Sequence, residues 1–263
     1  IGIILIGLGV CFIAFAHEQV LLGSFALTAA LLHTFNHSLF KGGLFLGAGA
    51  IQYSTQTKDM EKLGGLSKRI PVTAFFVLCF SLAISAIIPF NGFIGEWLTF
   101  QALFANILPG QTGIDILLIL AVAALGLAGG LVIACFVKFF GISFLGLPRS
   151  EQALQAKEVP LTMNISMGLL ACLCLFFGLF PLTILTLVDK VILSIGGSTV
   201  LGELRGEFFL LFYPLEIAGN EILPAAILGL VLVMIILTLL LLRMFGGKYI
   251  ERKYGTWDSG YEA

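Results

Sequence analysis

The feature that most constrains this chain is a series of long apolar runs. A run of about 18 or more apolar residues crosses a hydrocarbon layer of roughly 30 Å as a helix that rises about 1.5 Å per residue. Of the 263 residues, 59% are hydrophobic and 11% are charged, and the charged share is about half that of a soluble domain. The sequence therefore predicts an all-α, polytopic transmembrane bundle. Its expected membrane segments are residues 1–16, 23–52, 71–106, 114–145, 160–181 and 222–245.

The first segment is apolar from Ile1 onward. It has no basic leader and no small-residue cleavage site, so it does not resemble a signal peptide. Because there is also no initiating Met, we expect the chain to start inside a helix of a longer protein.

Segment 71–106 is too long for one straight crossing, because 36 residues of helix reach roughly 54 Å. Pro89 removes a backbone donor, and Asn91 and Gly92 follow it, so we expect a helix break here. If the segment crosses once, ten of the fourteen Lys and Arg residues share a side with the C-terminus; if it crosses twice, the split is six against six. Since Lys and Arg concentrate in cytoplasmic loops, the sequence favours one broken crossing and a cytoplasmic C-terminus.

Residues that bind metals or nucleotides are not grouped in any recognised pattern. The cysteines lie inside apolar runs, where a thiol packs as a small hydrophobe, and Cys172 and Cys174 lack a second ligand pair at zinc spacing. The glycine-rich stretch 126–130 is expected to be a close helix contact and not a phosphate loop. The net charge of −1 argues against a nucleic acid partner. We expect this chain to bind no cofactor and to carry out no redox chemistry itself.

Ionisable residues within the spans are the strongest functional signal. His33, His37 and Lys41 are spaced i, i+4 and i+8, which stacks them along one helix face over roughly 12 Å. Histidine exchanges protons near neutral pH, and lysine does so when it is removed from water. The alternative is that the histidines are packing residues and Lys41 reaches an interface. Three such groups on one stripe favour a proton relay.

Two more ionisable residues belong to the expected relay. Glu96 follows the predicted break by four residues, and broken membrane helices line hydrated cavities. The alternative is that Glu96 caps the restarted helix or pairs with a lysine. Lys138 lies toward the end of its span, where a relay role and an interfacial position are equally compatible with the sequence.

Three motifs in a fixed order resemble one family. They are 33–49 (HTFNHSLFKGGLFLGAG), 58–66 (KDMEKLGGL) and 84–97 (ISAIIPFNGFIGEW). They are similar to the antiporter-like subunits of respiratory complex I, multi-subunit sodium/proton antiporters and group-four nickel–iron hydrogenases. The stretch 91–97 and the tail 256–261 (TWDSGY) resemble most the hydrogenase 4 and formate hydrogenlyase type, although Ser259 stands where that type commonly has Cys.

The resemblance implies a fold of two inverted five-helix repeats, each with a discontinuous helix, of which this chain holds the second. Lys41 would match the relay lysine, His33 and His37 its neighbours, and Glu96 the acidic residue of the broken helix. Residues 1–145 would form this conducting half. Residues 146–245 would be C-terminal transmembrane helices with an external loop at 182–221 that contains short amphipathic helices, and 246–263 a cytoplasmic tail. Loop 53–70, with its spaced apolar residues, is expected to lie at the membrane interface.

The expected function is that of a proton-translocating subunit in the plasma membrane. It would be driven by partner subunits that carry a nickel–iron centre and iron–sulfur clusters. A sodium/proton antiporter subunit and a complex I subunit are the nearest alternatives. A purely structural membrane scaffold is an alternative of a different class.

Overall fold

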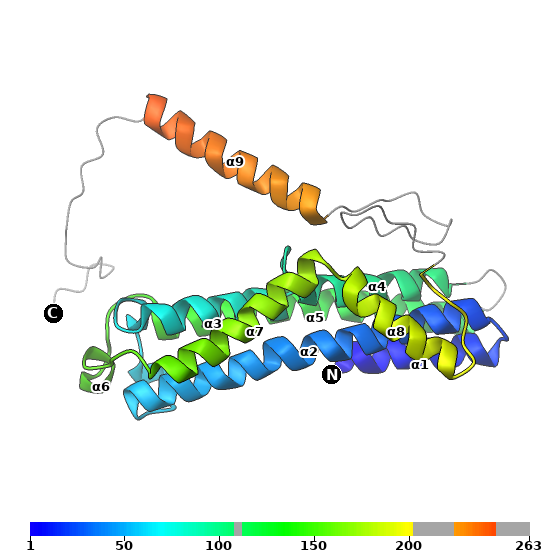
Figure 1. The fold of residues 1–263 in the computed structure, drawn as a ribbon, viewed down its shortest axis with the longest axis horizontal. Helices are drawn as coiled ribbons and strands as arrows, with labels where there is room; N and C mark the ends of the chain where they lie inside the picture. Colours follow the sequence, from blue (N-terminus) through cyan, green and yellow to red (C-terminus); the bar gives the residue numbers. More distant parts are fainter. Residues whose placement is uncertain (108–111, 202–223, 246–263) are drawn as a thin grey trace.

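The computed structural model describes residues 1–107, 112–201 and 224–245, and the first two of these ranges form a bundle of helices (Figure 1). The helices with more than four residues are α1 (Gly2–Ala16), α2 (Val20–Thr55), α3 (Pro71–Ile84), α4 (Asn91–Ala105), α5 (Thr112–Phe144), α7 (Leu161–Leu179), α8 (Leu182–Ser194) and α9 (Pro224–Phe245). The connections contain the 3-10 turns Met60–Lys62 and Leu66–Lys68 and the short helix α6 (Glu151–Leu154).

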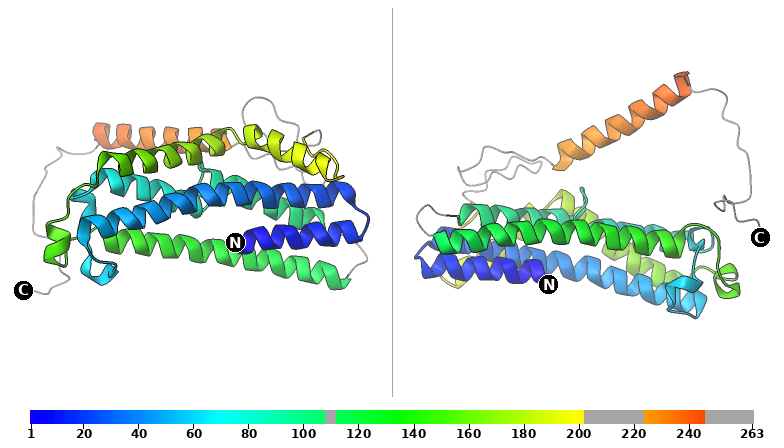
Figure 2. Two further views of the ribbon diagram at one scale, coloured as in Figure 1. Left: turned by 60° about the horizontal axis from the view of Figure 1, so that its bottom comes forward. Right: turned by 180° about the vertical axis from the view of Figure 1, so that it is seen from behind.

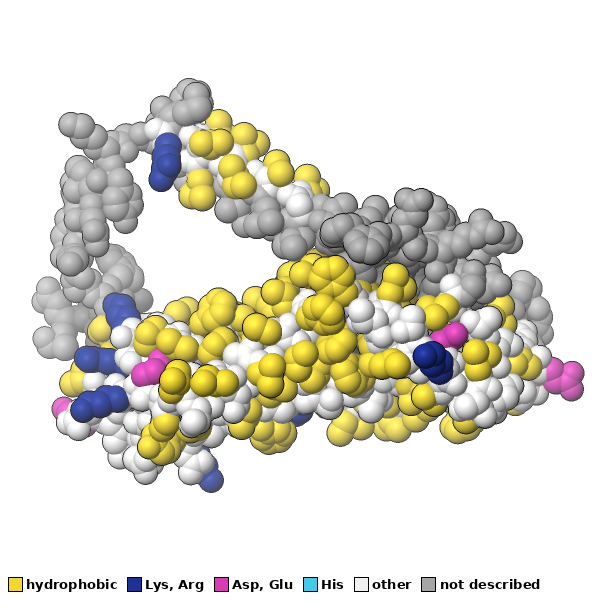
Figure 3. Space-filling model, in the orientation of Figure 1, with side chains coloured by type: hydrophobic (Ala, Val, Ile, Leu, Met, Phe, Trp, Pro, Cys, Tyr) yellow, Lys and Arg dark blue, Asp and Glu magenta, His cyan; other side chains and the backbone are white. Residues whose placement is uncertain are grey.

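Three helices of the described ranges are long and apolar enough to cross a membrane. They are Val20–Thr55, Gly113–Phe144 and Leu161–Leu179. Hydrophobic side chains cover the middle of the face shown in Figure 3, and most charged side chains gather toward its two ends. The predicted all-α transmembrane class is therefore confirmed.

Helix α2 is the central element of the bundle and runs along its length (Figure 2). Helices α1, α3, α4, α7 and α8 all pack against it. Small residues permit the close approach: a Cβ at Gly7 of α1 would lie 3.0 Å from the Cβ of Ala30. A Cβ at Gly47 would lie 2.6 Å from Cγ2 of Val77 on α3. Contacts between small residues drive helix association in a bilayer, where no hydrophobic force acts between helices.

The predicted interruption of segment 71–106 is present, because α3 ends at Ile84 and α4 begins at Asn91. Both helices run antiparallel to α2: Phe80 packs against Gly43, and Asn91 bonds to Asn36. The chain advances eleven residues from Phe80 to Asn91, while their partners Gly43 and Asn36 lie only seven residues apart. The break therefore contains four extra residues, and α3 and α4 together follow α2 as one interrupted, antiparallel element.

Helices α7 and α8 form a second interrupted element, with Pro181 between them. Gly178 of α7 lies against the first break, where a Cβ at position 178 would be 2.7 Å from the backbone nitrogen of Asn91. Helix α8 is one of the short helices expected within 182–221, and its apolar face packs into the bundle. The buried apolar residues of α8 are Ile184, Leu185, Val188 and Ile192. Residues 202–221 of the predicted external loop, and the predicted tail 246–263, lie outside the described residues.

Apolar residues of loop 53–70 are buried within the protein. Leu63, Leu66 and Ile70 are at most 2% exposed and pack with Phe144 of α5. Arg149 holds the loop in place, because its guanidinium donates to the carbonyl oxygens of residues 60, 61 and 142 at 2.7–3.0 Å. The spaced apolar residues of this loop therefore face protein, which the amphipathic pattern could not distinguish from a membrane surface.

Candidate functional site

The break between α3 and α4 is tied to α2 by two asparagines. The side-chain nitrogen of Asn36 donates to the backbone oxygen of Asn91 at 3.0 Å. The side-chain nitrogen of Asn91 donates back to Oδ1 of Asn36 at 3.1 Å. Gly92 is required at its position, because a Cβ there would collide with the carbonyl oxygen of Ala83. Pro89, Asn91 and Gly92 thus lie where the sequence placed the break.

His33 and His37 lie side by side on α2. Their ring centroids are 6.3 Å apart, and Phe40 presents its ring edge-on to both. His33 is 3% exposed, and its Nδ1 has no hydrogen-bond partner in the described part of the chain. The absence of a side chain at Gly95 lets α4 approach, since a Cβ there would lie 2.5 Å from Nδ1 of His33.

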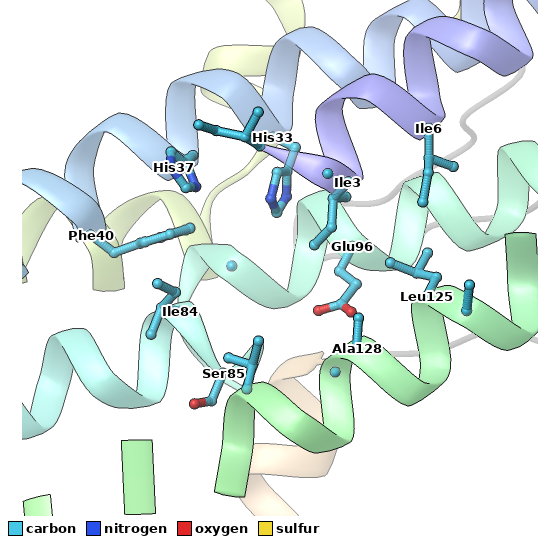
Figure 4. A pocket seen from close by; sticks show the side chains of 16 residues that line it. Ile3, Ile6, His33, His37, Phe40, Ile84, Ser85, Glu96, Leu125 and Ala128 are labelled. Atoms are coloured by element: carbon cyan, nitrogen blue, oxygen red, sulfur yellow. The ribbon is translucent and has the colours of Figure 1, made fainter. Parts of the chain in front are cut away.

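A cavity of about 410 Å³ joins the two histidines to the broken helix (Figure 4). The side chains of His33 and His37 point into it from α2, and Glu96 points into it from α4. The other walls come from α1, from the end of α3 with Ser85, and from α5. The predicted relay residues His33, His37 and Glu96 thus line one cavity. The helix break, the Asn36–Asn91 hydrogen bonds and the close approach at Gly95 together place α4 against α2 in this arrangement.

The glycine-rich stretch 126–130 belongs to α5, and its glycines have different surroundings. Gly126 and Gly130 have no neighbouring atom within 4 Å of an added Cβ, so no described helix packs closely there. Gly129 faces Glu96, and a Cβ at position 129 would lie 3.3 Å from Oε1. Among the described residues, the expected close contact with another helix is thus present at Gly129 and absent at Gly126 and Gly130. At Gly129 the missing side chain leaves room for the carboxylate.

Lys41 and Lys138 line a second cavity, of about 470 Å³, between α2 and α5. Lys41 is half-buried, with Nζ 5.6 Å from the ring centroid of Phe45, whereas Lys138 is exposed. The residues that line this cavity include no carboxylate. The stripe expected on one face of α2 is thus divided: the histidines face the first cavity, and Lys41 faces the second.

The geometry of the site would allow its ionisable side chains to bind protons and pass them on. Among the described residues, no three His, Cys, Asp or Glu side chains converge as a metal site. Asn36 and Gly129 are site residues that sequence reasoning missed. Their part depends on which residue of another helix lies opposite, and local spacing carries no signal of that.

Comparison with known proteins gives consistent matches. The family described as NADH:quinone oxidoreductase/Mrp antiporter, TM, matches residues 7–116. Hydrogenase-4 component B of Escherichia coli is 48% identical over 179 residues, which is 68% of this chain and 27% of that protein. Formate hydrogenlyase subunit 3 of the same organism is 41% identical over 178 residues, 68% of this chain and 29% of that protein. Na(+)/H(+) antiporter subunit A1 of Staphylococcus saprophyticus is 32% identical over 239 residues, 89% of this chain and 29% of that protein.

Two solved structures share the fold. The membrane-bound sulfane sulfur reductase, an archaeal respiratory membrane complex, matches with a TM-score of 0.67 and 22% identity over 99% of this chain and 42% of that one. The Mrp complex from Dietzia sp. matches with a TM-score of 0.54 and 21% identity over 63% of this chain and 37% of that one. The chain spans between a quarter and a third of the length of the curated relatives it matches. With the motifs, the broken helix and these matches in agreement, the chain belongs to the NADH:quinone oxidoreductase/Mrp antiporter transmembrane family.

Proposed function

We propose that this chain is part of a proton-translocating membrane subunit of a redox-driven complex, of the group-four nickel–iron hydrogenase type. The observation that carries the proposal is the cavity at the helix break, which His33, His37 and Glu96 line together. Ionisable side chains at membrane depth are costly, and a cavity that gathers three of them is typical of an ion pathway. Sequence identity of 48% to hydrogenase-4 component B supports the hydrogenase type.

In the proposed mechanism, Glu96 exchanges protons with the histidine pair across the first cavity. A proton on His33 disfavours a second proton on His37, because like charges repel across about 6 Å. A proton that leaves His37 passes to Lys41, one helical turn further along α2, and on to Lys138 through the second cavity. Charge changes driven by electron transfer in partner subunits would set the direction.

The proposal assigns the redox chemistry to other polypeptides. A nickel–iron centre and iron–sulfur clusters would lie in partner subunits, and this chain would bind none of them. The loops that carry most of the Lys and Arg residues would face the cytoplasm together with the C-terminus. Residues 1–145 would form the conducting half, and 146–245 the flanking transmembrane helices.

The test is to purify the native assembly that contains this chain from mild detergent and to measure its metal content and activity. Nickel together with hydrogen evolution, and proton uptake after reconstitution into vesicles, is the expected result. Flavin with NADH oxidation would instead assign the chain to a complex I assembly. The absence of any redox partner would overturn the proposal.

A sodium/proton antiporter subunit is the second candidate. It is favoured by the similarity to Na(+)/H(+) antiporter subunit A1, which extends over 89% of this chain. In that case, an imposed sodium gradient would drive proton movement in vesicles without any electron donor. Proton uptake that needs redox turnover and ignores sodium would exclude it.

A further inference from the structure

We infer that Asn36 is a positioning residue that fixes the α3–α4 break against α2 and so holds Glu96 opposite the histidines. The inference rests on the proposed function and adds to it a residue that contacts no transported proton. Asn36 lies three residues after His33 and one before His37, on the side of α2 that faces the break.

The contact between Asn36 and Asn91 is reciprocal and fully enclosed. Each side chain donates one hydrogen bond to the other residue, at 3.0 and 3.1 Å, and both residues are 0% exposed. In an apolar interior, an amide group without hydrogen-bond partners is strongly unfavourable. Oδ1 of Asn91 is buried without a partner among the described residues, so the two hydrogen bonds are what the pair gains in this register. Sliding the break along α2 would break both bonds, so the pair selects one register.

On the side of the break away from α2, the backbone is in close contact with α7. Gly178 of α7 lies against it so closely that a Cβ at position 178 would be 2.6 Å from the carbonyl carbon of Phe90. Asn91 is therefore held between α2 and α7, with hydrogen bonds on one side and backbone contact on the other. A break clamped in this way has one position relative to α2.

The position of Asn91 determines that of Glu96. Asn91 is the first residue of α4, and Glu96 lies five residues later on the same helix. Because a helix moves as a rigid unit, a shift or tilt at Asn91 is transmitted to the Glu96 carboxylate. A misplacement of about 1 Å between groups that exchange protons is sufficient to slow transfer by up to about a hundredfold.

The experiment compares Asn36→Leu with Asn36→Asp and with the control Ser38→Ala in the whole reconstituted complex. Leu removes both hydrogen bonds at similar volume, whereas Asp keeps the acceptor for the Asn91 amide. Ser38 is exposed on the same helix and bonds only within it. The readouts are proton uptake per redox turnover, the pH profile of uptake, and amide hydrogen exchange of residues 85–95.

For Asn36→Leu we expect an assembled complex, about tenfold lower uptake per turnover, a displaced pH profile and faster exchange at the break. Asn36→Asp should fall between Leu and wild type, and Ser38→Ala should match wild type. Less complex with unchanged uptake per turnover and an unchanged pH profile would show that Asn36 only stabilises the fold, which overturns the inference. If Leu prevents assembly, full uptake by Asn36→Asp with unchanged exchange would also overturn it.

Failure of the proposed function gives a different result. If the wild-type complex moves no protons, the proposed function is wrong. Amide hydrogen exchange would still show whether Asn36 holds the break against α2. Unchanged exchange at residues 85–95 in Asn36→Leu would then contradict the positioning role independently of transport.

Discussion

Gly129 of α5 lies opposite the carboxylate of Glu96, and a Cβ at position 129 would be 3.3 Å from Oε1. A Cβ at this distance would require the carboxylate to move by a few tenths of an ångström, and a larger side chain would require more. This contact places the glycine-rich part of α5 next to the proposed relay. A larger side chain at position 129 is therefore expected to affect proton transfer.

Gly129→Val should therefore lower proton uptake per turnover. The added methyl groups would push Glu96 out of its position and occupy part of the 410 Å³ cavity. We expect a loss on the order of tenfold or more, by the same sensitivity to misplacement. The matched control is Gly126→Val on the same helix, where an added Cβ has no neighbour within 4 Å. Equal effects of the two variants would contradict a specific role for Gly129.

Gly43→Ala should destabilise the bundle. A Cβ at position 43 would overlap the ring of Phe80, which is 0% exposed. Overpacking of a filled core costs about 1–3 kcal/mol, so thermal unfolding of the purified complex in detergent should occur at a lower temperature. Gly49 lies on the same helix, and an added Cβ there has no neighbour within 4 Å. The control variant Gly49→Ala should therefore unfold at the same temperature as wild type. An unchanged unfolding temperature for Gly43→Ala would show that α2 and α3 adjust freely.

Lys41→Gln should reduce transport more than Lys138→Gln. Both side chains line the second cavity, but Lys41 is half-buried one helical turn from His37, while Lys138 is exposed. Loss of a positioned proton-exchange group typically costs a hundredfold or more, roughly 10² to 10⁴, and we expect losses of this order for Lys41. The measurement is proton uptake by reconstituted complexes that carry Lys41→Gln or Lys138→Gln. A larger loss at Lys138 would reverse the proposed order of the relay.

The sequence predicted the broken helix well because the cause is local: Pro89 lacks a backbone hydrogen-bond donor and Gly92 lowers helix stability, wherever the segment packs. It did not predict the division of the relay stripe. At 3.6 residues per turn, Lys41 is rotated about 80° from His33 after eight residues, which places the lysine at a neighbouring cavity. Nor did it predict Asn36 and Gly129, since each acts through a residue of another helix. The burial of apolar residues of loop 53–70 against α5 was also not predicted, because packing against protein and contact with a membrane surface require the same apolar pattern.

The most direct test of the central claim is proton uptake by the Glu96→Gln complex. Gln keeps the size of the side chain and its place in the cavity but cannot take up and release a proton. The account predicts normal assembly, normal redox turnover and no proton uptake, whereas Glu18→Gln at the exposed turn between α1 and α2 should behave as wild type. Wild-type uptake by Glu96→Gln would contradict the account, and failure to assemble would show that Glu96 serves the structure of the bundle.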